Sequence, residues 1–105
     1  MTSKPNMSNI QAMSRGNKTF EDALLTVVRQ ELPEEILVFE ECIAHLRWMD
    51  AAECVHKIKH KISLLGMEEA FLRAEEYENQ LKKGESFGEV EFRKLLDSMK
   101  TFLEL

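Results

Sequence analysis

One segment of the chain carries the side chains best suited to chemistry. Residues 56–66 read His-Lys-Ile-Lys-His-Lys-Ile-Ser-Leu-Leu-Gly, and His56, Lys59 and Ser63 recur there at helical spacing. At about 100° per residue they share one polar strip beside an apolar stripe, so the strip is expected to face water. A neutral imidazole offers a nucleophilic lone pair, and a cation one turn away can offset the charge of a phosphoryl group. The pattern therefore favours an imidazole that accepts and releases a phosphoryl group.

Composition limits the possible classes of protein. The chain has 105 residues, of which 44% are hydrophobic and 31% charged, with 4 Gly and 2 Pro, which indicates one helical domain. A net charge of −5 disfavours a nucleic-acid partner. There is no run of about 18 apolar residues and no apolar signal-peptide core, so no membrane association and a cytoplasmic location are expected. Cys42 and Cys54 are expected to be buried and reduced.

Periodicity and breakers predict an all-α fold, an antiparallel four-helix bundle with a short additional N-terminal helix. Residues 1–16 are predicted to be a disordered or loosely packed tail, and residues 17–105 the domain. Pro33 is expected to open a new helix, Asp50 to cap the third, and Gly66 to end it. Residues 20–31 form either the short additional helix or an extension of the second helix across Leu32 and Pro33; the short helix is favoured, because the residue before a proline avoids helical angles. Lys57 and Lys61 are expected on the solvated side of that third helix. The predicted helices cover residues 20–31, 33–48, 51–65, 67–83 and 87–103.

The motif resembles that of the histidine-containing phosphotransfer (HPt) domain family of bacterial two-component phosphorelays. The family pattern is His-x-x-Lys-Gly-Ser-x-x-x-(Leu/Ile)-Gly, with a further Leu-Glu-x-x-Leu and Gly pattern near the end of the next helix. The resemblance covers residues 20–105. The matching positions are His56, Lys59, Leu65, Gly66, Tyr77, Glu78, Leu81 and Gly84.

The resemblance implies a phosphoprotein of signal transduction. His56 would accept a phosphoryl group on Nε2 from a receiver-domain aspartyl phosphate and pass it to another receiver, with Lys59 as the charge partner of the phosphate. Ala52, His60 and Ser63 would belong to the docking surface. The implied partners are response-regulator receiver domains and a hybrid sensor histidine kinase, and the protein would be a monomer without a cofactor. No ATP-binding or kinase motif occurs, so an enzyme is not expected.

Two alternatives remain at this stage. His60 stands where the family usually has glycine, so the domain could dock receivers without phosphotransfer. Glu53 and His60 also lie at helix-face ligand spacing from His56, as in metal sites. Because no second Glu-x-x-His occurs, no resident metal site is predicted.

Overall fold

The computed structural model describes residues 4–105, and this part of the chain contains five helices and no strand. The prediction of an all-α fold is therefore confirmed. The expected helices 67–83 and 87–103 are present as α4 and α5, with ends shifted by one or two residues. The helices are α1 (Ser8–Ser14), α2 (Lys18–Ala44), α3 (Trp48–Leu64), α4 (Glu68–Lys82) and α5 (Glu89–Leu103).

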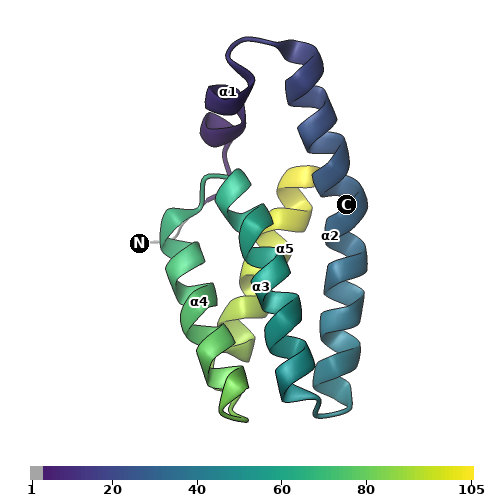
Figure 1. Ribbon diagram of the computed structural model, residues 1–105, viewed down its shortest axis with the longest axis vertical. Coiled ribbons are helices and arrows are strands. Elements are labelled where there is room, and N and C mark those ends of the chain that lie inside the picture. Colours follow the sequence, from purple (N-terminus) through teal and green to yellow (C-terminus); the bar gives the residue numbers. More distant parts are fainter. Residues whose placement is uncertain (1–3) are drawn as a thin grey trace.

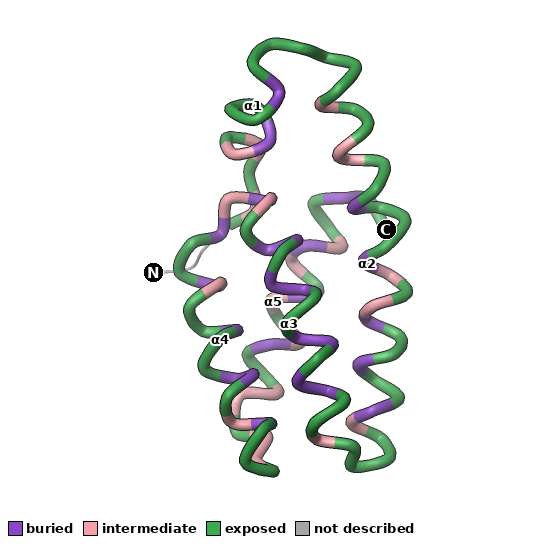
Figure 2. The backbone as a smooth tube through the Cα atoms, in the orientation of Figure 1, coloured by how far each residue is buried: buried purple, intermediate pink, exposed green. Residues whose placement is uncertain are grey.

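Helix α3 lies between its two main neighbours, α2 on one side and α4 on the other, while α5 packs on α4 (Figure 1). The buried residues follow the faces on which these helices meet (Figure 2). An aromatic cluster joins α2, α4 and α5, because the ring of Phe92 lies 5.1 Å from that of Phe39 and 5.2 Å from that of Tyr77. The Phe39–Phe92 contact is edge-on and the Tyr77–Phe92 contact is tilted, and aromatic pairs of this kind add to the hydrophobic gain. The residues that fix α3 are Val55, Ile58 and Ile62, all fully buried.

Helix α2 is continuous across Pro33, so the prediction of two separate helices over 20–31 and 33–48 is wrong. A proline inside a helix removes one backbone hydrogen bond and crowds the preceding turn. Here the buried residues Val28, Leu32 and Ile36 keep one helical face on both sides of the proline. Burial of this face outweighs the local cost, as is usual for helices stabilised by tertiary packing. Asn17 caps α2 by accepting from Phe20 N at 3.0 Å.

The turn before α3 also differs from expectation. Helix α3 begins at Trp48 without a side-chain cap, and Asp50 lies in its first turn, so the predicted capping role of Asp50 is wrong. The chain reverses through Leu46 at φ 57°, a conformation that leucine rarely adopts. No glycine, asparagine or proline marks this turn, which is why the sequence placed the boundary too late. The predicted end of the helix is confirmed, because Gly66 has φ 71°.

The N-terminal segment contains a short packed helix. Residues 1–16 were expected to form a disordered or loosely packed tail; residues 1–3 lie outside the described residues, but α1 buries Ile10 completely. Asn6 N donates to Leu65 O at 2.8 Å, and Asn9 Nδ2 donates to Ser63 O at 2.8 Å. Both acceptors are backbone carbonyls at the C-terminal end of α3, and Ser63 O also accepts from Gly66 N at 3.0 Å. The segment is thus tied to the helix that carries His56.

In the part of the chain that is described, no helix combines the length and the apolar character needed to cross a bilayer.

The continuity of α2 can be tested at its proline. Pro33→Ala restores an N–H donor inside the helix, so the free energy of unfolding should rise by about 1–3 kcal/mol. Urea unfolding followed by circular dichroism measures the change. The control is Glu34→Ala, since Glu34 is exposed next to the proline. An unchanged or lower stability of Pro33→Ala would mean that a helix boundary lies at this position.

Candidate functional site

A buried carboxylate, that of Glu78 on α4, collects three nitrogen groups at the contact between α3 and α4. Glu78 is only 5% exposed. Its Oε1 lies 2.8 Å from Lys59 Nζ, and its Oε2 lies 3.2 Å from Lys82 Nζ and 3.3 Å from His56 Nδ1. A buried carboxylate is tolerated only when it is well paired. The cluster therefore ties α3 to α4 and sets the surroundings of His56.

The imidazole of His56 has one nitrogen turned to this carboxylate while its side chain stays 57% exposed. A carboxylate beside Nδ1 favours the tautomer that carries its proton there. In the neutral ring, Nε2 then holds the free lone pair on the side away from Glu78. The arrangement provides an oriented nucleophile that is open to solvent.

Lys59 does not face water as the strip pattern predicted. It is 8% exposed, pairs with Glu78, and places its ammonium 5.3 Å from the centre of the Phe71 ring. Lys82 is the more accessible cation, with a side chain that is 50% exposed. The two ammonium groups and the single carboxylate leave one net positive charge beside His56.

The charges of the cluster also set the protonation of Glu78. Burial by itself would raise the pKa of the Glu78 carboxyl, but the ammonium groups of Lys59 and Lys82 more than offset this and hold the pKa below its ordinary value of 4.5. The carboxylate is therefore charged at neutral pH and accepts a proton only in acid.

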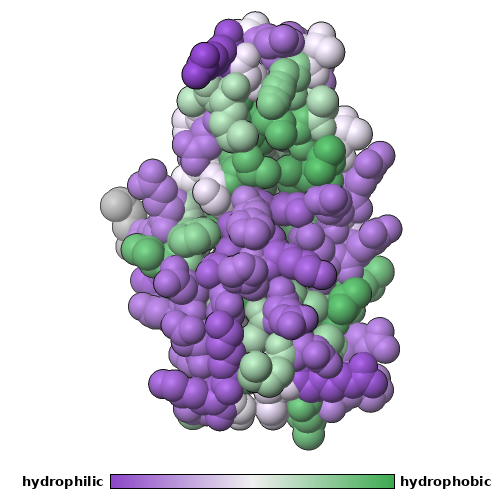
Figure 3. Space-filling view, viewed as in Figure 1, coloured by the Kyte–Doolittle hydropathy of each residue, from purple (hydrophilic) through white to green (hydrophobic). Residues whose placement is uncertain are grey.

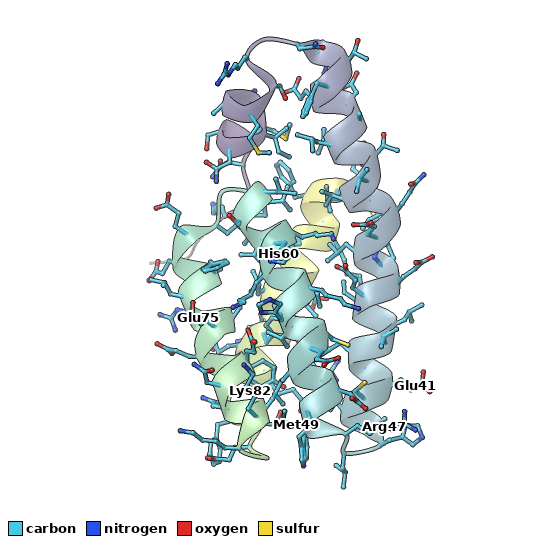
Figure 4. All side chains as sticks on the ribbon, viewed as in Figure 1. Glu41, Arg47, Met49, His60, Glu75 and Lys82 are labelled. Carbon is cyan, nitrogen blue, oxygen red and sulfur yellow. The ribbon has the colours of Figure 1, made fainter. Side chains whose placement is uncertain are left out.

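The other predicted site residues divide into exposed and buried ones. Ala52 is 1% exposed, so its predicted place on an accessible docking surface is wrong; it packs in the core. His60 and Ser63 are exposed, as expected of a docking surface. The ring of His60 lies 5.4 Å from that of His56, at an interplanar angle of 73°. Figure 4 labels His60 on α3 beside α4, and Figure 3 shows that this face is hydrophilic over the middle of the molecule and hydrophobic where α1 meets α2.

Lys61, expected on the solvated side of α3, is 9% exposed and faces α2. Its ammonium donates to Glu31 Oε1 at 2.7 Å and to Glu35 Oε2 at 3.0 Å. Burial would lower the pKa of Lys61, but these two carboxylates raise it above its ordinary value. The helix-wheel placement failed here because α2 packs on that side of α3 and supplies the acidic partners. Lys57, in contrast, is exposed as predicted.

Sequence reasoning gave no role to Glu78 or Lys82. Glu78 was present as part of the downstream pattern, and Lys82 follows it at the i,i+4 spacing that favours an ion pair on a helix. Their proximity to His56 depends on how α3 packs against α4, which helical periodicity within one segment does not fix.

Cys42 and Cys54 are free and buried, as predicted. Burial, together with the neighbouring Cys42, raises the pKa of the Cys54 thiol to about 11, so it is protonated at neutral pH. Within residues 4–105, no three side chains of His, Cys, Asp or Glu are grouped so that they could hold a metal ion.

Comparison of the chain with protein-family models, with curated proteins and with solved structures gave no match. Its function is therefore inferred from the geometry around Glu78 and His56.

The structural role of Glu78 gives a pH-dependent prediction. Because its pKa is lower in the folded chain, the carboxylate contributes stability that is present above pH 4.5 and is lost as the pH falls through the folded value. Glu78→Gln should lower the free energy of unfolding by about 1–3 kcal/mol at neutral pH, since buried Lys59 loses its charged partner. The gap from wild type should narrow in acid. Urea unfolding at about pH 7 and about pH 3 tests both statements.

The control is Glu75→Gln, because Glu75 is exposed on the same helix (Figure 4). A deficit of Glu78→Gln that is equally large at both pH values would show that the charge of the carboxylate is not what stabilises the fold.

Proposed function

We propose that this chain is a phosphotransfer carrier of the HPt type, an antiparallel four-helix bundle that works in a cytoplasmic two-component phosphorelay. The observation that carries the proposal is the state of His56. Its imidazole is 57% exposed, and its Nδ1 lies 3.3 Å from the buried carboxylate of Glu78. Together with the matching motif spacing, this geometry supports a histidine that is held in one tautomer and presents Nε2 to a partner.

The proposed reaction uses that nitrogen directly. The lone pair on Nε2 attacks the phosphorus of an aspartyl phosphate on a receiver domain, a P–N bond forms, and the P–O bond to the aspartate breaks with release of its carboxylate. The same step in reverse passes the phosphoryl group to the aspartate of a second receiver. Glu78 acts as a positioning residue, because its negative charge beside Nδ1–H stabilises the positive charge that develops on the ring.

The surrounding charges suit a phosphoryl group. A phosphorylated side chain carries about −1.5 to −2 charge at neutral pH. Lys59 and Lys82 bring two positive charges against the one negative charge of Glu78. Lys59 is fixed by burial, whereas Lys82 is half-exposed and can turn toward the phosphate. Lys82 thus joins Lys59 as a charge partner in this proposal.

The docking surface is proposed to surround His56 with His60 and Ser63, both exposed. The partners would be response-regulator receiver domains and a hybrid sensor histidine kinase, which supply the acceptor aspartates, and the chain would act as a monomer. His60 narrows the approach to His56, because the two rings are in contact at 5.4 Å between centres. That contact favours one second candidate, a module that docks receivers without accepting phosphate.

Phosphotransfer from isotopically labelled phospho-receivers separates the two candidates. The wild-type chain is expected to take up label, and His56→Gln to take up none, because glutamine has no nucleophilic nitrogen. His45→Gln is the matched control, since His45 is exposed on the turn after α2. Binding of receivers without label on the wild type would support the docking module instead, and label on His56→Gln would move the acceptor to another residue.

The two lysines should behave differently. Lys82→Ala should slow transfer about two- to fivefold, which corresponds to the loss of a half-exposed charge interaction of up to about 1 kcal/mol, and should lower the free energy of unfolding by no more than that. Lys59→Ala should slow transfer and also lower the free energy of unfolding by about 1–3 kcal/mol, because Glu78 keeps fewer partners in a buried site. Time courses of phosphotransfer measure the change in rate, and thermal unfolding measures the change in stability. Lys83→Ala, at the exposed next position, is the control; an equal loss of rate there would assign the effect to general surface charge.

A further inference from the structure

The exposed imidazole pair of His56 and His60 has a property that phosphotransfer does not use. The two residues are one helical turn apart on α3, and their ring centres are separated by 5.4 Å. Both are exposed, so a ligand can reach both rings from the solvent side. Two imidazoles at i and i+4 on one helix face are at the spacing found in metal-binding helices.

Glu78 strengthens the case for the first imidazole. Histidines that bind a metal usually turn their second ring nitrogen to a carboxylate, a carbonyl or water, which orients the ring and increases its basicity. His56 has this arrangement, with Nδ1 3.3 Å from Glu78 Oε2. Nε2 is therefore oriented as a metal ligand for the same reason that it is oriented as a nucleophile.

We infer that His56 and His60 chelate a divalent transition-metal ion such as Zn²⁺ on the solvent side of α3, with water molecules completing the coordination. Imidazole nitrogen suits zinc, copper and nickel, and not the hard cation Mg²⁺. The described residues offer no group of three ligands, so the ion is held by two side chains and exchanges readily. The site is thus a reversible one, distinct from a structural zinc site with four protein ligands.

One consequence rests on the proposed function. The lone pair on Nε2 of His56 cannot bind a metal ion and attack phosphorus at the same time. The bound ion therefore blocks phosphorylation until it dissociates, and the chain responds to the free concentration of the metal. His60, at the position where it narrows access to His56, provides the second ligand that makes this competition effective.

Titration of the 105-residue chain with ZnCl₂, followed by the NMR signals of the three imidazoles, tests the metal site. One equivalent of Zn²⁺ is expected to shift the signals of His56 and His60 and to leave that of His45 unchanged, and MgCl₂ is expected to shift none. His60→Gln should weaken zinc binding roughly tenfold or more, and Glu78→Gln should also weaken it, since outer partners typically matter about 10- to 100-fold. His45→Gln is the matched control.

Several results would overturn the inference. Zinc binding as strong in His60→Gln as in the wild type would overturn it. If that binding were then lost in Cys54→Ser, the ion would lie on the thiols. The competition is measured with phosphoramidate, a small phosphoryl donor that needs no receiver. Saturating Zn²⁺ should slow labelling of the wild type about tenfold or more, and should slow labelling of His60→Gln much less.

Equal rates of labelling with and without bound zinc would remove His56 as a ligand and overturn the inference. A wild-type chain that takes no label even without zinc would contradict the proposed function alone. The titration would then decide the metal site by itself.

Discussion

The burial of one carboxylate determines the character of this site. Glu78 is 5% exposed, and it stays charged because neighbouring ammonium groups hold its pKa below the ordinary value. Lys59 pairs with it from α3 and Lys82 pairs with it from its own helix. His56 comes within reach of the same oxygen as Lys82. The ion pairs that stabilise the contact between α3 and α4 thereby also fix the direction of an exposed imidazole.

The rest of the fold serves to hold α3 rigidly beside that carboxylate. The stripe of Val55, Ile58 and Ile62 is fully buried, which prevents rotation of the helix about its axis. On the side facing α2, Lys61 is fixed by Glu31 and Glu35. Its low exposure and the double pairing mean that removing either acid leaves a buried charge partly satisfied, which is costly. α3 is thus oriented by apolar burial in its middle and by ion pairs on both flanks.

The sequence predicted what depends on local pattern. Helical periodicity and the spacing of apolar residues identified the all-α class. Gly66 was placed correctly after α3, because helices commonly end at a residue with left-handed backbone angles and glycine adopts them without strain. The prediction that His56 is exposed was also right. The boundary expected at Pro33 is absent, because the local cost of proline is visible in the sequence while the burial of the helical face around it is not.

Most of the unpredicted features depend on which helices meet. Lys59 and Lys61 appeared as solvated lysines on a helical wheel, and only the neighbouring acids Glu78 and Glu31 explain why both are buried. The turn through Leu46 gave no signal at all, because leucine is a poor residue for its left-handed conformation. A lysine at the edge of an apolar stripe can therefore be buried when a neighbouring helix supplies an acidic partner.

The same reasoning explains why His56 can both attack a phosphoryl group and bind a metal ion. A carboxylate behind an imidazole increases the basicity of the opposite nitrogen, and it does so for any electrophile, whether phosphorus or a metal ion. The phosphoryl group and the metal ion differ in the sign of their charge. The net positive charge from Lys59 and Lys82 favours the phosphoryl group and opposes a dication, so only a second ligand can make metal binding compete. His60 stands where that ligand is needed, one turn from His56, with 5.4 Å between the centres of the two rings.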